Sequence, residues 1–419
     1  MRVDALSTDL PPLPVTLADL LAARSIVEAA VVRTPTLRAP RLSALTGADV
    51  WVKYETFQTT ASFKERGAVV KLARLTPEEA RRGVIAMSAG NHAQAVAYHG
   101  TRLGISTTIV MPESTPHVKV AATEAFGARV VLHGEGVGDA EQEALRIAAE
   151  EGRVFVHPYE DKDVIAGQGS IGLEMIEDGP KFDALIIPVG GGGLIAGVAL
   201  AVKGLSPDTE VVGVEAALYP AMWSALNGHA RPCGGPTLAE GIAVRNVGQM
   251  TTQIIRDLVA EIVLVEETTL EQAVNALLTH QKVLAEGAGA AGLAAMLAQP
   301  ERFKGKTVGL MLSGGNIDPR VLASILVREL EREHRIVSFR LTILDRPGML
   351  GMITTRLGQL GANILEVHHR RTFLDVPAKG TRLDLTVETR DALHAEKIQR
   401  ALEAEGLPVE RLAAGGTEW

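Results

Sequence analysis

The 419-residue chain contains one cysteine, Cys233, so no disulfide can form within it. Aromatic residues make up only 4% of the chain, so the core must consist mainly of aliphatic side chains. Basic residues are not in excess, because 42 lysines and arginines stand against 50 acidic residues, and this argues against nucleic acid as a partner. The lack of cysteine clusters gives no sign of a zinc site and favours a reducing, cytoplasmic compartment.

A hydrophobic run of the kind that a membrane helix needs is also missing. Residues 184–202 carry no charge, but Pro188 and four consecutive glycines interrupt them. The N-terminus contains Arg2, Asp4 and Asp9 and has no apolar segment typical of a signal peptide. We therefore expect neither a membrane association nor a secretion signal.

Between residues 50 and 330, short runs of β-branched and aliphatic residues alternate with amphipathic or alanine-rich stretches. The runs predicted as strands are Val84–Met87, Thr107–Val110, Val130–Leu132, Leu185–Ile187, Val211–Val214 and Val308–Leu312. This alternation predicts an α/β fold of open parallel sheets with helices on both faces. The first domain is expected to span residues 1–330, with a smaller subdomain at about 50–155.

After a charged helix predicted at 321–335, the pattern changes to strands in which apolar and polar residues alternate. The predicted elements are strands from 337 and around 383–387, helices at 349–360 and 392–405, and further strands at 363–373 and 408–412. Their order is βαββαβ, which is the ferredoxin-like α+β arrangement. This second domain is expected to span residues 335–419.

A lysine begins a predicted helix in the segment Ala61-Ser62-Phe63-Lys64-Glu65-Arg66-Gly67-Ala68. The dipole of a helix opposes a positive charge at its N-terminus, so the pKa of Lys64 should be lowered and more of its amine neutral. A neutral amine is required for a Schiff base with a carbonyl compound. A lysine exposed to solvent is the commoner explanation, and this segment alone does not decide between the two.

A run of glycines follows the predicted strand at 185–187 and opens a predicted helix. The run consists of Gly190, Gly191, Gly192, Gly193 and Leu194. Its N–H groups could converge on a phosphate at the helix N-terminus. A tight structural turn is one alternative. The fingerprint Gly191-x-Gly193-x-x-Ala196 is another, because it would suit a nicotinamide-dependent oxidoreductase.

Two further polar segments follow predicted strands. They are Ser88, Ala89, Gly90, Asn91 and His92 after the strand at 84–87, and Ser313-Gly314-Gly315-Asn316 after the strand at 308–312. In open α/β sheets ligands bind at the carboxyl edge of the strands, so all four segments could face one crevice. His92 taken alone would more often be a structural histidine.

Together these segments resemble the pyridoxal-phosphate enzymes of the tryptophan-synthase-β-like fold, and among them the threonine and serine dehydratases. The resemblance covers residues 15–330. It implies that Lys64 holds the cofactor and acts as the base, that Gly190–Leu194 bind its phosphate, that Asn91 bonds the ring oxygen and that Ser313 bonds the ring nitrogen. The segment Ser88–His92 would receive the substrate carboxylate.

The activity implied by this resemblance is the dehydration and deamination of L-threonine to 2-oxobutanoate and ammonia, a first step towards isoleucine. L-serine would give pyruvate, and the enzyme would be a homodimer or homotetramer. A preference for serine or another 3-hydroxy amino acid stays open. A hydroxyl group beside the ring nitrogen leaves that nitrogen neutral, which favours β-elimination over transamination.

Two departures from the wider family narrow these expectations. Serine racemases, which resemble this chain, carry a serine at the position of Ala89, and a methyl group cannot return a proton to the α-carbon. The racemase-like branch also binds a divalent ion through a glutamate followed six residues later by an aspartate. Here Glu215 is followed by Ala221 at that spacing, so no metal is predicted. Glu286 suits either an active-site acid or an acid at a helix start.

The second domain resembles an ACT-type amino-acid-sensing module in its segments Asp345–Leu350 and Gly361–Ile364. Such modules pair edge to edge and bind a free amino acid at the pairing surface. The resemblance therefore implies an effector site near Asp345, Gly348 and Asn363, with isoleucine or valine as the expected effector. A sensor without catalytic activity is the remaining alternative.

Overall fold

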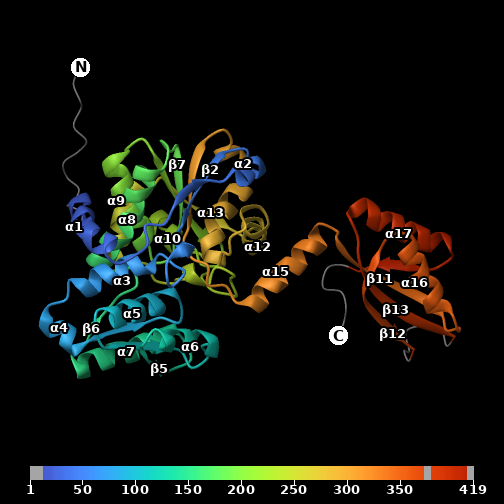
Figure 1. The fold of residues 1–419 in the computed structure, drawn as a ribbon, viewed down its shortest axis with the longest axis horizontal. Coiled ribbons are helices and arrows are strands. Elements are labelled where there is room, and N and C mark those ends of the chain that lie inside the picture. Colours follow the sequence, from blue (N-terminus) through green and yellow to red (C-terminus); the bar gives the residue numbers. More distant parts are fainter. Residues whose placement is uncertain (1–12, 372–378, 413–419) are drawn as a thin grey trace, which may run out of the picture. The chain divides into compact units, whose positions relative to one another are not determined.

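The computed structural model describes residues 13–371 and 379–412, and these fall into two compact units that divide between Ile317 and Asp318 (Figure 1). Each unit is described by itself. The sequence had suggested a division at 330–335, whereas the structure groups α15 (Pro319–Arg332) with the second unit. The predictions that concern Arg2, Asp4 and Asp9, and the end of the predicted strand at 363–373, lie outside the described residues.

The first unit contains two sheets. The larger has the order β1 (Thr36–Arg38), β2 (Asp49–Tyr54), β10 (Thr307–Leu312), β7 (Ala184–Pro188), β8 (Glu210–Ala216) and β9 (Glu261–Val265). The smaller has the order β5 (Arg129–Leu132), β4 (Thr107–Met111), β3 (Val84–Met87) and β6 (Val154–Phe155). All neighbouring strands are parallel except β1 and β2. The predicted α/β class with parallel sheets is therefore confirmed.

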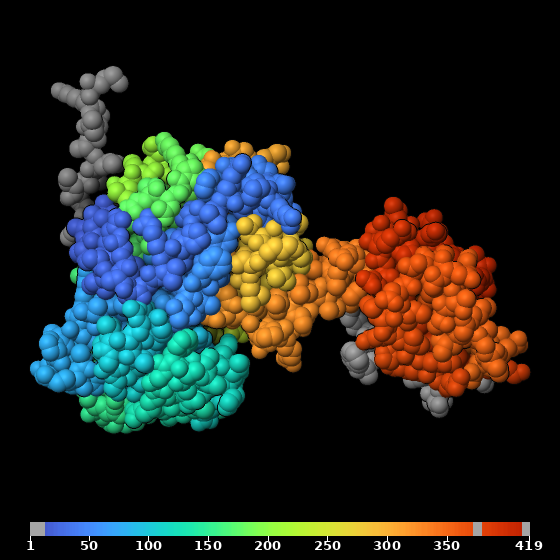
Figure 2. Space-filling view, viewed as in Figure 1, coloured from blue at the N-terminus to red at the C-terminus, as the bar shows by residue number. Residues whose placement is uncertain are grey.

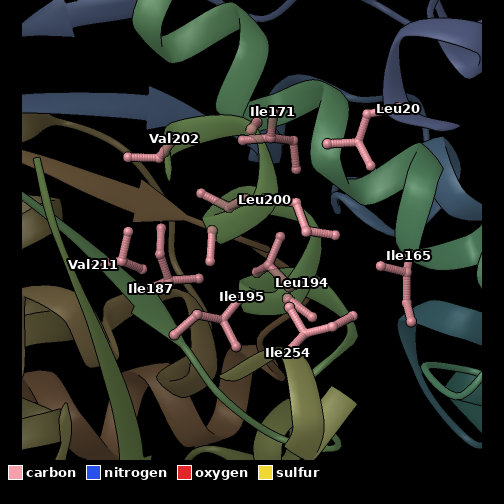
Figure 3. Packing of buried hydrophobic residues seen from close by; sticks show 14 of the residues in the cluster. Leu20, Ile165, Ile171, Ile187, Leu194, Ile195, Leu200, Val202, Val211 and Ile254 are labelled. Atoms are coloured by element: carbon pink, nitrogen blue, oxygen red, sulfur yellow. The ribbon is translucent and has the colours of Figure 1, made fainter. Parts of the chain in front are cut away.

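Helices cover both faces of the larger sheet. On one face lie α1 (Leu17–Glu28), α8 (Lys162–Asp178), α9 (Gly193–Leu205) and α11 (Gln249–Leu258), and α13 (Gly287–Ala298) packs on β7 and β10. Figure 3 shows the aliphatic side chains between these helices and the sheet, among them Ile187, Ile195 and Val211. Helices α8 and α9 approach closely because both present glycine: a Cβ on Gly197 would lie 2.6 Å from the Gly169 nitrogen. This small-residue packing agrees with the low aromatic content.

The smaller sheet is covered on one face by α3 (Lys64–Ala73), α5 (Asn91–Arg102) and α6 (His117–Ala125), and on the other by α7 (Val137–Glu151). In the space-filling view the cyan to teal segments that contain α5, α6 and α7 form one continuous part of the surface of the first unit (Figure 2). Helix α3 packs on both α5 and α8, so it lies between the two sheets. This position brings Lys64 to the junction of the two halves of the unit.

Shorter helices complete the first unit. They are α2 (Pro40–Thr46), η1 (Glu55–Phe57), α4 (Pro77–Arg82), α10 (Ala221–Asn227), η2 (Glu240–Ile242), α12 (Glu267–Ala276), η3 (Leu277–Gln281) and α14 (Pro300–Phe303). Local sequence explains their ends: Thr76 and Glu79 form a capping box at the start of α4, with Pro77 at its first position. None of the helices in the described part of the chain is both long and apolar enough to cross a membrane.

The second unit contains an antiparallel sheet of order β12 (Asn363–Arg370), β13 (Gly380–Glu388), β11 (Ile336–Leu344) and β14 (Val409–Arg411). Helices α16 (Met349–Gln359) and α17 (Ala392–Ala404) pack on one face of this sheet. The predicted βαββαβ order is present. Side chains along β11 alternate between buried and partly exposed, as the period of two predicted.

Candidate active site

Lys64 is the first residue of α3, as predicted, and its side chain is partly buried. Its Nζ donates a hydrogen bond to the Pro158 carbonyl oxygen at 3.0 Å. Burial lowers the pKa of Lys64 to about 8. The negative charge of Glu286 raises this pKa, but by less than burial lowers it. The sequence attributes a lowered pKa to the helix dipole, whereas in the structure the removal of the amine from water lowers the pKa.

This pKa predicts the pH at which Lys64 becomes reactive. A pKa of about 8 in place of 10.5 leaves roughly a tenth of the amine neutral at pH 7, and the fraction rises with pH. In the protein freed of cofactor, we expect reductive methylation of Lys64 by formaldehyde to reach half its maximal rate near pH 8, measured by peptide mass spectrometry. A midpoint near 10.5 would contradict this environment for Lys64.

The segment before Lys64 is joined to the segment after β10. Phe63 N donates to the Ser313 carbonyl at 3.0 Å, Gly315 N donates to the Ala61 carbonyl at 3.0 Å, and Ser62 and Gly314 form an antiparallel bridge. Ala61 adopts a left-handed φ of +52°, which is unfavourable for alanine. Two of the four segments singled out in the sequence therefore meet through their backbones at the start of α3.

A third segment reaches the same place through Asn91. The Asn91 Nδ2 donates to Glu286 Oε1 at 2.7 Å, and the Asn316 Nδ2 donates to Asn91 Oδ1 at 2.7 Å. Burial raises the pKa of Glu286 to about 7, while its hydrogen bond from Asn91 lowers it. Glu286 is thus an acid of this site as well as the N-cap of α13, and both explanations offered by the sequence apply.

The side chains of His92 and Ser88 are engaged within the protein. The His92 ring lies 2.9 Å from the Val156 carbonyl through Nε2, and burial lowers the pKa of His92 to about 3, so the ring is neutral. The Ser88 hydroxyl accepts a hydrogen bond from Gly90 N at 3.1 Å. The first N–H groups of a helix have no partner within it, so the start of α5 offers backbone donors to an anion.

The glycine run lies between β7 and α9, and Tyr159 packs against it. A Cβ on Gly191 would lie 2.3 Å from the Tyr159 ring, and one on Gly193 would lie 2.9 Å from the Tyr159 Cα. Gly192 has a φ of +95°, which favours glycine. The Leu194 side chain is buried in the core, so only its backbone is available to a ligand. Close packing therefore accounts for part of this run, in line with the tight turn that the sequence leaves open beside phosphate binding.

Sequence reasoning missed the loop that covers the glycine run. Besides Pro158, this loop supplies Tyr159, whose hydroxyl donates to the Asn246 carbonyl at 2.7 Å, and Glu160, which accepts from Met250 N at 2.7 Å. Their position directly after the short strand β6 is a signal that could have found them, because it is the same sheet edge that carries the Ser88–His92 segment.

Glu215, considered above for a metal site, has other partners. Its carboxylate oxygens accept from Met222 N at 2.7 Å and Trp223 N at 2.9 Å, at the start of α10. Burial raises the pKa of Glu215 to about 7, although these hydrogen bonds by themselves lower it. The Glu215 side chain therefore caps the N-terminus of α10.

Behind Lys64, the Arg66 side chain is fully buried in a group of charges. Arg66 bonds Glu55 and Glu174 through two contacts each, at 2.7 to 2.9 Å, and Ser170 at 3.1 Å. All five of its N–H donors are therefore used. Lys53 bonds Glu174 as well, so two cations balance two anions. This cluster ties α3 to η1 and α8 and holds the helix that begins with Lys64.

The three residues expected to bind an effector do not meet within one chain. Asp345 follows the end of β11, and Gly348 caps α16 with a φ of +89°. Asn363 begins β12, where it pairs with Glu388, and Glu388 also pairs with Ile336 at the start of β11. Asn363 and Asp345 therefore lie at opposite ends of the sheet.

The residues present fit pyridoxal phosphate. The Lys64 amine has a lowered pKa, and a helix preceded by glycines presents N–H groups. The buried Ser62 hydroxyl, two residues from Lys64, has no hydrogen-bond partner among the described residues. A buried hydroxyl without a partner is costly unless a ligand completes it.

Comparison with known proteins gives consistent matches. The family of pyridoxal-phosphate-dependent enzymes matches residues 27–314. The chain is 44% identical to an L-threonine ammonia-lyase of Thermotoga maritima over 94% of this chain and 99% of that one. It is 41% identical to the catabolic L-threonine dehydratase of Escherichia coli over 73% of this chain and 94% of that one.

Solved structures agree with this result. The processed form of threonine deaminase isoform 2 from Solanum lycopersicum is 34% identical and superposes with a TM-score of 0.69, covering 77% of this chain and 93% of that one. Maize serine racemase is 31% identical, with a TM-score of 0.71 and coverage of 76% and 99%. The structures cover about three quarters of this chain.

Proposed function

Because the chain belongs to the family of pyridoxal-phosphate-dependent enzymes, we propose that it converts L-threonine to 2-oxobutanoate and ammonia, with L-serine as a second substrate. The similarity over almost the whole length of an L-threonine ammonia-lyase supports threonine as the substrate. The observation that carries the reaction is the partly buried Lys64 amine, whose pKa is lowered to about 8 at the junction of the two sheets. The single cysteine supports a cytoplasmic location.

Pyridoxal phosphate, when bound, withdraws electrons from the substrate and so weakens the bond between its α-carbon and hydrogen. Lys64 would hold the cofactor through Nζ, and the same amine, freed when the substrate's amine takes its place, would accept the proton that leaves the α-carbon. Loss of this proton together with the β-hydroxyl group releases one water molecule. Hydrolysis of the carbon–nitrogen bond then consumes one water molecule and releases ammonia.

The other site residues bind and orient. The backbone N–H groups of Gly190–Leu194 bind the phosphate at the start of α9. Asn91 donates a hydrogen bond to the ring oxygen, and the Ser313 hydroxyl bonds the ring nitrogen. The substrate carboxylate is received at the start of α5 by the Ser88–His92 segment, through N–H groups and the Ser88 hydroxyl.

Racemisation of serine is a second candidate because maize serine racemase has a similar structure. Ala89 argues against it, because its methyl group cannot donate a proton to the α-carbon. We expect serine that remains after the reaction to keep its L configuration.

The proposal is tested by incubating the purified protein with L-threonine or L-serine. The 2-oxo acid and ammonia should form in equal amounts, and the protein should carry a yellow chromophore that borohydride bleaches. Chiral chromatography of the remaining serine tests racemisation in the same samples. A protein that holds the cofactor but forms no 2-oxo acid from either amino acid would contradict the proposal, and a colourless protein that binds NAD would favour an oxidoreductase.

The second unit acts as an ACT-type regulatory domain in this proposal. Its edge strand β12 pairs only with β13 among the described residues, so a second copy can pair with its free edge. If two copies pair in antiparallel fashion, the start of one β12 lies beside the end of the other. Arg371, which follows β12, forms an ion pair with Asp345 at 3.3 Å, so Asp345 lies near the end of β12. In such a pair Asn363, at the start of β12 in one copy, would approach Asp345 of the second copy. A homodimer or larger assembly would complete the effector site.

Ending the chain at Ile317 is expected to remove regulation and keep catalysis. The catalytic candidates all precede this residue, and the Escherichia coli dehydratase aligns with only 73% of this chain. Coupling between two sites typically changes affinity by roughly 5- to 150-fold, so isoleucine or valine should shift the apparent threonine affinity of the intact enzyme by such a factor. The truncated enzyme should show no shift in the same titration. An equal response of both forms would place the effector site in the first unit.

A further inference from the structure

Three side chains from distant segments form a hydrogen-bonded chain at the proposed active site. Asn316, after β10, donates through Nδ2 to the Thr60 main-chain carbonyl at 2.9 Å and to Asn91 Oδ1 at 2.7 Å. Asn91, at the start of α5, donates through Nδ2 to Glu286 Oε1 at 2.7 Å. The chain therefore runs from a backbone carbonyl, through two amides, to a carboxylate.

The direction of this chain follows from its two ends. A main-chain carbonyl only accepts hydrogen bonds, so the atom of Asn316 that faces Thr60 must be nitrogen. That nitrogen also faces Asn91, so the facing atom of Asn91 must be oxygen. The other side of the Asn91 amide then presents nitrogen to Glu286 Oε1, which accepts. The Thr60 carbonyl thus fixes one orientation of an amide that could otherwise be turned either way, and an acceptor at Glu286 Oε1 agrees with it.

These two hydrogen bonds determine which atoms of Asn91 are available to a ligand. One of its two N–H groups is used by Glu286, and its oxygen is engaged by Asn316. The second N–H is the donor that remains for a bound molecule, and it would face an acceptor atom of that molecule. Gly314 leaves room for this arrangement, because a Cβ there would lie 2.5 Å from Glu286 Oε1.

We propose that Glu286 and Asn316 are positioning residues, which hold the Asn91 amide so that it presents a donor to the ring oxygen of pyridoxal phosphate. This rests on the proposed function, because that function places the ring oxygen at Asn91. Glu286 also occupies the N-cap position of α13, without a side-chain capping hydrogen bond, and a purely structural role at this helix start is the competing explanation. The two explanations differ in whether the effect of a substitution depends on the ring oxygen.

The test compares two cofactors on the enzyme freed of cofactor: pyridoxal phosphate, and its 3-deoxy analogue, which lacks the ring oxygen. Glu286→Ala and Asn316→Ala should each weaken binding of pyridoxal phosphate by about 10-fold, as expected for the loss of a well-oriented hydrogen bond to a charged oxygen. Binding of the analogue should change less than twofold. Glu286→Gln can still accept from Asn91 through its amide oxygen, so it should bind pyridoxal phosphate almost as the unchanged enzyme does.

Glu78→Gln is the matched control, because Glu78 is an exposed acid that pairs with Arg82 on α4 and lies outside this chain of hydrogen bonds. It should change neither affinity. If the alanine variants weaken binding of both cofactors equally, the positioning role is overturned and a structural role explains the effect. If the unchanged enzyme binds neither cofactor, the proposed function itself fails, so the two failures are distinguishable. Glu286→Gln keeps the test usable if the alanine variants do not fold.

Discussion

Replacing Lys64 by alanine is expected to reduce the formation of 2-oxobutanoate by roughly 10³-fold or more, because the change would remove both the proposed covalent anchor and the proposed base. The fold should survive. In the structure the Lys64 side chain makes one hydrogen bond, to the Pro158 carbonyl, and a contact of its Nζ with the Phe63 ring at 5.1 Å. Turnover is measured with L-threonine, and the fold is checked by circular dichroism.

Lys71→Ala provides the control on the same helix. Lys71 lies in the last turn of α3 and pairs with Asp161 at 2.6 Å, away from the start of the helix. This variant should keep its cofactor and its turnover. Near-normal turnover of the Lys64 variant would refute the assigned role, and loss of activity in both variants would point to a general effect on α3.

Replacing Arg66 by methionine is expected to lower the free energy of unfolding of the first unit by about 3 to 5 kcal/mol, because removing one partner leaves uncompensated buried charges. Arg66 and Glu55 are completely buried. Burial by itself would raise the pKa of Glu55, but Arg66 holds that pKa below its ordinary value. Lys53 alone cannot compensate Glu55 and Glu174 together. The loss is measured as a shift of the urea unfolding midpoint.

Arg74→Ala is the comparison for this prediction. Arg74 caps the other end of α3 and pairs with Asp163 near the surface, at 2.6 Å. An ion pair in contact with solvent contributes about 0 to 1 kcal/mol, so the urea midpoint should hardly move. Equal shifts of the urea midpoint in the two variants would show that the buried cluster contributes no more to stability than a surface ion pair. A partial recovery in Arg66→Met with Glu55→Gln would confirm that the unpaired carboxylate is the cause.

Much of the fold could be predicted because the signals are local. The strands at 84–87 and 308–312 and the start of α3 at Lys64 agree with the structure to within a residue. Periodicity, glycine ends and proline starts act on neighbouring residues, so they can be read from one segment. The same holds for the alternation that predicted β11.

Part of the site could also be predicted, because parallel strands bring their carboxyl ends to one edge. The segments at Lys64, Asn91 and Ser313 are indeed connected by hydrogen bonds or backbone pairing. The sequence did not reveal Tyr159 as the residue that packs on the glycine run, nor Glu286 as the partner of Asn91. Both contacts join segments far apart along the chain, and no local pattern encodes them.

By itself, the sequence determined the element types, their order, the two-part organisation and the residue types able to hold the cofactor, because these depend on local propensity and spacing. Only the tertiary structure decided which groups lose contact with water and which of them meet. Burial sets the pKa of Lys64, and packing between α3, α8 and η1 pairs Arg66 with two carboxylates. The register of β11, β12 and β13 separates Asp345 from Asn363. Desolvation and register arise from long-range packing, so neither is present in any single segment.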